Sequence, residues 1–345
     1  MLNCEVRNDK DGRTMLPGLK NLFNWSMGCM LFTPVTDMRD SYAPSLPPYN
    51  DVNRVPSKQM ASAPAILPKV LKTVQKLYPV ALADKTWDNT GLLLEAPIPH
   101  RPAANGVSRV LLTIDLTTAV AEEALREGSG VAVIVAYHPI IFRGLKSLTM
   151  KDTQQRSLLR LAAAGISIYA PHTAVDAAVG GVNDWLADGV SGGKEHEEKR
   201  EVLQNGTKVE GHEDGGMGRL VELKEPLELI ELVKRVKKLT GLKYVQVARP
   251  QLLEKVKTIA ICAGSGGSLF RGVQADCFFT GELGHHETLA TVENGMSAII
   301  CGHTNTERGF LAAVMKPRLE ELLKEEEEKI EVVVSEGDRD PVEIM

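Results

Sequence analysis

Aromatic side chains are scarce in this chain of 345 residues, where Phe, Trp and Tyr together make up 5%. Proteins that stack the bases of single-stranded nucleic acids need exposed aromatic rings, so this scarcity argues against such a surface. Positive charge is not in excess either, because the formal net charge is -5. Without a basic surface, affinity for nucleic acid or for anionic membranes has no general electrostatic source. We therefore expect no direct nucleic-acid partner.

Long apolar runs are also absent, and no stretch approaches the roughly 20 residues of a transmembrane helix. Cysteine is rare, and the chain contains no CxxC pair. An odd number of scattered cysteines is typical of reduced thiols in an intracellular protein. We therefore expect a cytoplasmic protein without a membrane partner, while the nucleus and the mitochondrion stay open as locations. The five cysteines are Cys4, Cys29, Cys262, Cys277 and Cys301.

The first 59 residues differ from the rest of the chain, since they are rich in Pro, Asn and Asp and show no sustained periodicity. We expect residues 1–59 to form a mostly disordered leader. Mitochondrial presequences avoid acidic residues, so Glu5, Asp9 and Asp11 argue against a presequence here. Met60 opens the first globular stretch, and our hypothesis is that the leader is an upstream extension of the functional chain.

Three short apolar runs in the chain each end next to a histidine, namely His138, His172 and His303. A single histidine of this kind is more often a hydrogen-bonded core residue than a ligand. Three histidines at equivalent strand ends instead predict a metal or acid–base cluster at one edge of a sheet. A carboxylate follows two of them after four residues, as Asp176 and Glu307. The strands are predicted at 131–136, 166–170 and 298–301.

Strands and helices alternate through much of the chain, and short connections join them. This order predicts βαβ units and largely parallel sheets in an α/β fold. After Val190 the composition changes to Gly, Glu, Lys and His without core residues, which predicts a solvated linker. We expect His196 and His212, which lie in this segment, to face solvent. The predicted parts are an N-terminal α/β lobe at 60–190, the linker at 191–216 and a C-terminal α/β lobe at 217–345.

Two acidic positions near predicted strands allow two interpretations each. Asp88 lies in a turn signal before a strand, where turn chemistry and a role in the site weigh equally. Asp115 ends a strand at 109–114, and completing a capping turn is slightly favoured over lining the site. At the other end of the chain, we expect Thr304 or Thr306 to cap a helix at 307–325.

The second half holds two further candidates. A glycine-rich turn follows a predicted strand at 262–268, where backbone N–H groups can cradle a phosphate. The turn lacks the lysine of a P-loop, so a tight structural turn is at least as well supported. His286 follows another predicted strand and faces either the predicted cleft or the surface of the next helix.

Four ordered motifs in the chain resemble those of one protein family. They are YHPIIF at 137–142, PHTAVDAA at 171–178, TGE at 280–282 with His286, and GH at 302–303 with TER at 306–308. They make the chain similar to the Nif-three-like family, also described as GTP cyclohydrolase I type 2-like or dinuclear-metal-centre proteins. The resemblance covers roughly residue 60 to the C-terminus.

The resemblance implies an α/β fold of two similar lobes, with a metal site at the C-terminal ends of the strands. It also implies a homo-oligomer, from dimer to hexamer. One or two divalent ions (Zn, Fe or Mn) would bind to each chain. The implied metal ligands are His138, Asp176, His303 and Glu307, and the implied catalytic neighbours are His172 and His286.

Tyr137 departs from the family pattern, because many bacterial members have two consecutive histidines where this chain has Tyr137-His138. A phenol with an ordinary pKa near 10 is a poor metal ligand. We therefore expect the substitution to weaken one of the two metal positions.

Two functions from different classes fit these observations. The first is a metal-dependent, cyclohydrolase-like hydrolase acting on a nucleotide or a related small molecule. The second is a non-catalytic regulatory or scaffold protein that binds transcriptional, corepressor-type partners. An open coordination position is typical of a catalytic site, whereas protein ligands close a structural one.

Overall fold

The computed structural model describes residues 66–251, 255–324, 326 and 329–343. These residues belong to one compact unit, which spans Lys58–Met345. The leader predicted at 1–59 lies outside the described residues, as do Cys4 and Cys29. The other three cysteines are buried and form no disulfide. Within the described ranges, no helix combines the length and the apolar character that a membrane crossing requires.

The first sheet is mostly parallel and has the strand order β1-β4-β3-β2-β13. Its strands are β1 (Gly91–Leu94), β2 (Ser108–Thr113), β3 (Val131–Ala136), β4 (Ser167–Ala170) and β13 (Ile330–Val334). Strands β13, β2, β3 and β4 run parallel, and β1 joins the edge in the antiparallel direction. All six residues of β3 are buried. A run of apolar residues without alternation is expected for a central parallel strand covered on both faces.

The second sheet has a parallel centre with antiparallel edges, in the order β5-β8-β10-β11-β12-β9. Its strands are β5 (Glu197–Glu201), β8 (Arg219–Glu228), β9 (Gln246–Ala248), β10 (Lys255–Ser265), β11 (Cys277–Glu282) and β12 (Ser297–Ile300). A short ribbon of β6 (Gln204–Asn205) and β7 (Gly216–Met217) lies apart from both sheets. The predicted α/β class with largely parallel sheets is therefore confirmed.

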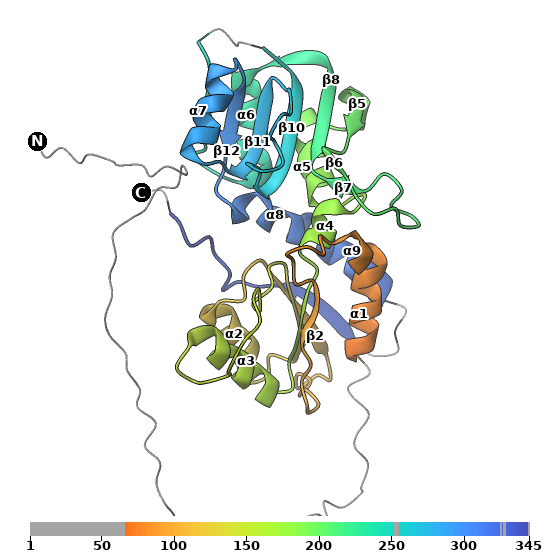
Figure 1. Cartoon of the computed structure of the whole chain (residues 1–345). Helices are drawn as coiled ribbons and strands as arrows, with labels where there is room; N and C mark the ends of the chain where they lie inside the picture. The colour runs from red at the N-terminus through yellow and green to blue at the C-terminus, as the bar shows by residue number, and fades with distance from the viewer. Residues whose placement is uncertain (1–65, 252–254, 325, 327–328, 344–345) are drawn as a thin grey trace, which may run out of the picture. The chain divides into compact units, whose positions relative to one another are not determined.

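Helices cover both sheets and join distant parts of the chain. The α-helices are α1 (Ile66–Leu77), α2 (Thr118–Leu125), α3 (Thr153–Ala163), α4 (Thr173–Ala177), α5 (Val182–Ser191), α6 (Leu229–Thr240), α7 (His285–Glu293), α8 (Arg308–Phe310) and α9 (Lys316–Leu323). The described residues also contain the 3-10 helices η1 (Val80–Leu82), η2 (Lys194–His196) and η3 (Thr304–Thr306) and the π-helix η4 (Leu311–Met315). Helices α1 and α9 lie side by side although they are far apart in the sequence (Figure 1).

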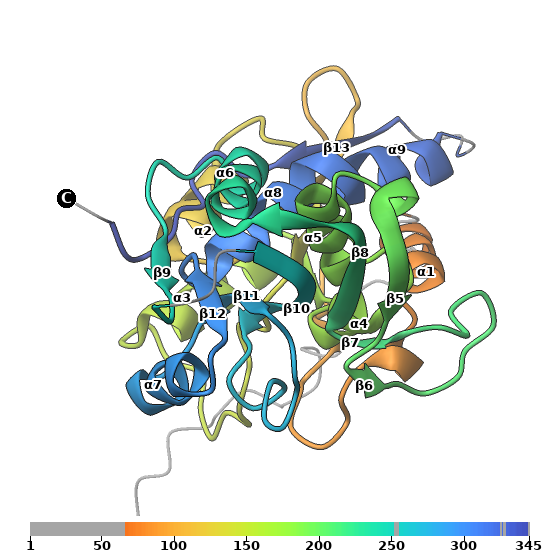
Figure 2. The ribbon, with the colours of Figure 1, turned by 90° about the horizontal axis from the view of Figure 1, so that it is seen from above.

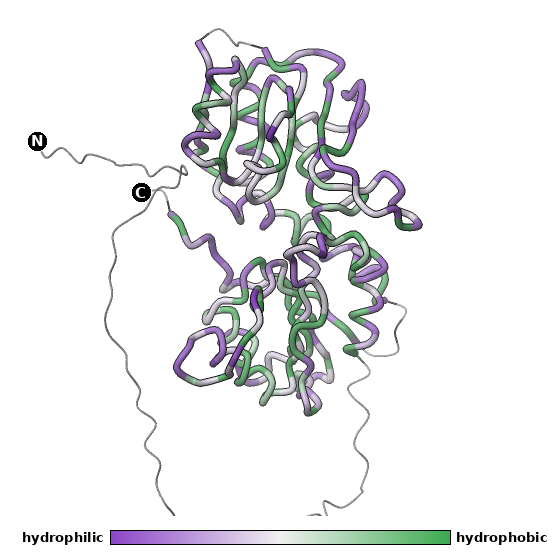
Figure 3. Tube along the Cα trace, in the orientation of Figure 1, coloured by the Kyte–Doolittle hydropathy of each residue, from purple (hydrophilic) through white to green (hydrophobic). Residues whose placement is uncertain are grey.

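One apolar cluster contains buried residues from both sheets, including Val133 of β3, Phe279 of β11 and Phe310 of α8. Seen from above, α5 lies beside α6 and next to the strands β8 and β10 (Figure 2). Hydrophobic residues dominate the central strands, whereas they alternate with polar residues along the helices (Figure 3). The last strand, β13, comes from the predicted C-terminal lobe and pairs with β2 of the first sheet. The division into two lobes stays a prediction.

Three local predictions differ from the structure. His212 was expected to face solvent, but it is 8% exposed and its Nδ1 accepts the Val179 N–H at 3.0 Å. The polar composition of its segment hid this contact, because the contact depends on a partner far away in sequence. His196, by contrast, keeps 63% of its side chain exposed, as predicted.

The predicted helix at 307–325 is interrupted by η4, directly before Pro317. Proline has no N–H to donate to the preceding turn, which explains a local change of hydrogen-bond pattern. The predicted caps are also wrong, since neither Thr304 nor Thr306 caps this helix. The Thr304 hydroxyl donates to Asp340 at 2.6 Å, and the Thr306 hydroxyl donates to the His303 carbonyl at 2.8 Å.

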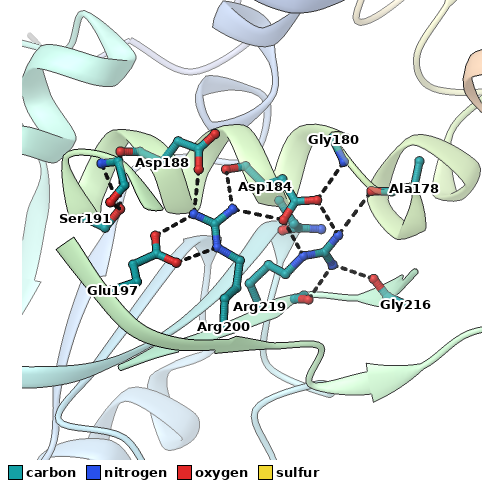
Figure 4. Close-up of polar contacts among 12 residues, drawn as sticks. Ala178, Gly180, Asp184, Asp188, Ser191, Glu197, Arg200, Gly216 and Arg219 are labelled. Atoms are coloured by element: carbon teal, nitrogen blue, oxygen red, sulfur yellow. Dashed lines mark hydrogen bonds and ion pairs between the residues drawn. The ribbon is translucent and has the colours of Figure 1, made fainter. Parts of the chain in front are cut away.

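A buried polar network fixes α5 against the second sheet (Figure 4). The guanidinium of Arg219, whose side chain is 3% exposed, donates to both carboxylate oxygens of Asp184 at 2.7 and 2.8 Å. Its other donors reach the carbonyls of Gly216, Gly218 and Ala178. A buried ion pair stabilises a structure only when its remaining donors and acceptors are satisfied, and this pair meets that condition.

Asp184 is the acceptor on which this network depends. It also receives the Gly180 N–H at 2.7 Å and lies 3.1 Å from Nη1 of Arg200. Burial raises the pKa of Asp184, but the hydrogen bond and the charge of Arg219 have the larger effect and lower the pKa to about 2. The folded state therefore favours the ionised carboxylate more than the unfolded chain does.

This pKa gives a pH-dependent prediction. The contribution of Asp184 is complete above its ordinary pKa of 3.8 and is lost as the pH falls towards 2. The total loss amounts to about 2 kcal/mol of unfolding free energy. Asp184→Asn should destabilise the chain by about 3 kcal/mol at neutral pH, because it leaves Arg219 buried without a counter-charge. Urea unfolding at pH values between 7 and 2 measures both effects.

Glu231→Gln is the matched control, since Glu231 forms an exposed pair with Lys234 on α6. Its effect should stay below about 0.5 kcal/mol. Parallel acid-induced losses in the wild type and in Asp184→Asn would contradict the assignment, because the variant no longer has the titrating group.

Candidate metal centre

The carboxyl ends of strands from both sheets meet at one place. His138 follows β3, His172 follows β4 and His303 follows β12, while Gly264 is the second-last residue of β10. The rings of His138 and His172 have centroids 5.3 Å apart, and those of His138 and His303 are 5.2 Å apart. The three histidines predicted from the sequence to cluster therefore do so.

Three side chains converge closely enough to hold a metal ion. They are His138, His303 and Glu307, and one ligand atom of each lies within 4.8 Å of the other two. Nε2 of His138 is 3.3 Å from Oε2 of Glu307, and Nε2 of His303 is 3.6 Å from Oε1 of the same carboxylate. Two imidazole nitrogens and one carboxylate form a donor set suited to Zn, Fe or Mn.

Two of these ligand atoms are buried and, apart from their 3.3 Å contact with each other, have no hydrogen-bond partner. They are Nε2 of His138 and Oε2 of Glu307, whose side chain is 3% exposed. Buried polar atoms are nearly always satisfied, so each exception requires an explanation. A cation held between the two atoms would satisfy both of them, so these residues fit a metal ion.

The far side of each ligand imidazole is held by a second carboxylate. Nδ1 of His138 lies 2.9 Å from Asp115, and Nδ1 of His303 lies 2.8 Å from Glu282. Such partners fix the ring orientation and leave the lone pair of Nε2 for a metal. The sequence analysis slightly favoured a capping turn for Asp115, but its contact with His138 places it in the site. Glu282, at the end of β11, also belongs to the site.

The same carboxylates make the site strongly attractive to positive charge. Burial lowers the pKa of His138, but Asp115 and Glu307 have the larger effect and raise the pKa to about 10. The surroundings thus favour a cation at this point, whether it is a proton or a metal ion.

Asp176 lies beside this group but outside its set of three ligand atoms. Its Oδ1 accepts a hydrogen bond from the hydroxyl of Tyr137. Burial raises the pKa of Asp176 to about 6, and burial together with the charge of Asp176 raises the pKa of Tyr137 well above its ordinary value. The hydroxyl of Tyr137 and the carboxylate of Asp176 therefore serve as each other's hydrogen-bond partner.

A cavity of 380 Å³ opens beside two of the three ligands, His303 and Glu307. His172 and Asp176 also line it, together with Ser265, the last residue of β10. His172 therefore belongs to the cavity wall, and its catalytic role stays a prediction. His286 instead is exposed on α7 and lines a different cavity with Phe270 and Glu287. A catalytic role for His286 stays a prediction.

The first part of the turn predicted at 262–268 belongs to β10 instead, and Gly264 there leaves room for the ligand atoms. Gly264 has a φ of +62°, and a Cβ built there would lie 2.8 Å from both Nε2 of His303 and Oε1 of Glu307. Its N–H donates to the Thr306 hydroxyl at 2.9 Å, so this amide does not face the cavity. Gly266 likewise donates inwards, to the Glu282 carbonyl at 3.3 Å. These two amides support the structural interpretation of the turn.

Two side chains that the sequence did not reveal connect segments of the two sheets at the site. Asn183 of α5 is 1% exposed, donates to the Asp176 carbonyl at 3.0 Å and accepts the Ala263 N–H at 2.9 Å. Asp338 pairs with Arg308 at 2.6 Å and accepts the Ile114 N–H at 2.7 Å. No local motif signals either residue, because each connects segments that are distant in the chain.

Residues 66–341 match the family described as Duf34/NIF3 (NGG1p interacting factor 3). The chain belongs to this family. A NIF3 homolog of Schizosaccharomyces pombe is 53% identical over 279 residues, which cover 80% of this chain and 97% of that protein. The NGG1-interacting factor 3 of Saccharomyces cerevisiae is 43% identical, with coverage of 81% and 97%. The predicted resemblance to NIF3 proteins is thereby confirmed.

Two solved structures support the fold. A Bacillus cereus protein related to NIF3 has a TM-score of 0.67 at 20% identity, covering 81% of this chain and 98% of the other. Reduced HcgD from Methanocaldococcus jannaschii has a TM-score of 0.61 at 22% identity, covering 78% and 97%. At these identities the likeness is one of fold.

Gly264 provides a test of the candidate metal centre. Gly264→Ala should weaken Zn²⁺ binding on the order of tenfold or more, because the added methyl group takes the space between His303 and Glu307. Gly272→Ala is the matched control, since Gly272 also has a positive φ (+81°) but open space around its Cβ position. Isothermal titration of the metal-free variants with Zn²⁺ measures the difference. Equal affinities in the two variants would contradict the assignment.

Proposed function

We propose that this NIF3-family chain binds one divalent ion through Nε2 of His138, Nε2 of His303 and the carboxylate of Glu307. The pair of buried atoms without hydrogen-bond partners, in His138 and Glu307, is the observation that carries this proposal. The mixed nitrogen and oxygen donors favour Zn, Fe or Mn over Ca or Mg.

One ion, rather than two, is supported by the partners of Asp176. A second position would use the Asp176 carboxylate and the side chain at position 137. In this chain those two side chains are hydrogen-bonded to each other, through the buried hydroxyl of Tyr137. A protonated phenol donates to the carboxylate and offers the metal a weak ligand.

We propose further that the site acts as a metal-dependent hydrolase. A divalent ion supplies Lewis acidity and lowers the pKa of a bound water towards neutrality. Asp115 and Glu282 keep the two imidazoles oriented, and Gly264 keeps the approach to them open. Three protein ligands, two of which line a cavity of 380 Å³, leave room for a small substrate, as in catalytic rather than structural sites. A nucleotide or a related small molecule is the proposed substrate class.

The second candidate is a regulatory protein that binds a transcriptional partner. It is favoured by the name of the Saccharomyces cerevisiae relative, NGG1-interacting factor 3. In this case the ion would stabilise the strand ends without turning over a substrate. Self-assembly into a homo-oligomer and a cytoplasmic location stay predictions under both functions.

Metal content tests the number of ions directly. Elemental analysis of protein purified without chelators or affinity-tag metal should give about one ion per chain. His303→Ala should lose this ion, and His196→Ala should keep it, because His196 is exposed and lies outside the site. Tyr137→His should raise the content towards two, whereas Tyr137→Phe should not, because it removes the hydroxyl without adding a nitrogen ligand.

The absence of bound metal in the wild type, after addition of Zn, Mn and Fe in turn, would refute the metal proposal. The hydrolase proposal has its own test, in which the metal-loaded wild type and His303→Ala are incubated with nucleoside triphosphates and the products are separated. Equal turnover, or no turnover in a loaded wild type, would exclude hydrolysis of these nucleotides at this centre and favour the partner-binding function.

A further inference from the structure

Asp88 is not one of the proposed metal ligands, yet both of its carboxylate oxygens have hydrogen-bond partners. It lies before β1, and its side chain is 0% exposed. One oxygen accepts from the Thr173 hydroxyl at 2.5 Å and from the Thr90 hydroxyl. The other lies 2.7 Å from Nδ1 of His172. A turn alone does not require a carboxylate that is held so completely.

The charge of Asp88 decides which nitrogen of His172 carries the proton. Burial raises the pKa of Asp88, but its hydrogen bonds, that of His172 foremost, lower it to about 2. An ionised carboxylate can only accept, so Nδ1 of His172 must donate. In a neutral imidazole the proton on Nδ1 leaves a lone pair on Nε2.

The backbone also holds His172 in an unusual position. Among the described residues other than glycine, it alone has a positive φ, at 30° with ψ at -117°. Its N–H donates to the Tyr137 carbonyl at 3.1 Å, which ties the start of α4 to the end of β3. Strained residues of this kind cluster at functional sites, where the surrounding structure maintains them.

Together these constraints direct His172 to the cavity beside the proposed metal site. Its ring packs edge to face against His138, with centroids 5.3 Å apart, and against Tyr137 at 6.2 Å. His172 nevertheless does not belong to the three residues whose ligand atoms lie within 4.8 Å of one another. Its free nitrogen is therefore available to a molecule in the cavity rather than to the ion.

We propose that Asp88 is a positioning residue, which locks His172 in the tautomer with the proton on Nδ1. Nε2 then serves as a hydrogen-bond acceptor in the cavity. The ligand that it recognises is a small molecule, or a water, that presents an O–H or N–H donor beside the ion. The role of this ligand rests on the proposed function, whereas the tautomer does not depend on it.

The tautomer can be measured in the metal-free, full-length protein with ¹⁵N-labelled histidine. Long-range ¹H–¹⁵N correlation at alkaline pH distinguishes a protonated ring nitrogen from an unprotonated one, and His172→Gln assigns the signal. We expect Nδ1–H with unprotonated Nε2 in the wild type. Asp88→Asn should reverse the pattern, because the asparagine amide donates to Nδ1. Asp84→Asn is the control, since Asp84 accepts from Thr86 and Trp87 instead of from His172.

Zn²⁺ titration separates this proposal from that of the metal site. Asp88→Asn should keep its Zn²⁺ affinity within about threefold of the wild type, while His303→Ala loses binding. A wild-type spectrum with the proton on Nε2 would overturn the proposal even if Asp88→Asn fails to fold. The same holds for an unchanged tautomer in folded Asp88→Asn, or for a loss of Zn²⁺ as large as in His303→Ala, which would make His172 a ligand.

Discussion

The site depends on one repeated interaction, in which a carboxylate holds Nδ1 of a histidine at a strand end. Asp115 holds His138, Glu282 holds His303 and Asp88 holds His172, at distances between 2.7 and 2.9 Å. Each bond orients one ring and determines which nitrogen keeps its lone pair. The repeated pattern places imidazole nitrogens with free lone pairs where the two sheets meet, and the carboxylate of Glu307 is buried among them.

Such a group of charges is stable only if the surrounding structure fixes the position of one sheet relative to the other. The structure meets this requirement with polar contacts that are themselves buried and satisfied. Asn183 connects the Asp176 segment to the end of β10, and the pair of Asp184 and Arg219 fixes the helix that carries Asn183. A shift of α5 would therefore disturb the cavity as well as the core, so the geometry of the site and the stability of the fold are coupled.

The sequence predicted the parts of the site that depend on local pattern. Apolar runs gave the strands, and the residues after them gave His138, His172 and His303. The sequence did not show which carboxylate meets which histidine, because Asp115 and His138 are 23 residues apart and Glu282 and His303 are 21 apart. Asp88 was ambiguous for the same reason, since its role depends on a partner 84 residues away. His212 was misjudged because composition alone does not reveal a buried contact.

Strand β13 has a consequence for how the protein is made. It pairs with β2 although it is translated after every other described strand, and Asp338, which follows it, supplies the acceptor for the Ile114 N–H beside Asp115. A nascent chain that ends before this point exposes the edge of β2, and open parallel edges promote association between chains. Pairing of such distant segments also slows folding. The first sheet is therefore incomplete until the end of synthesis, and the candidate metal centre gains its final supports only when the last described strand has been made.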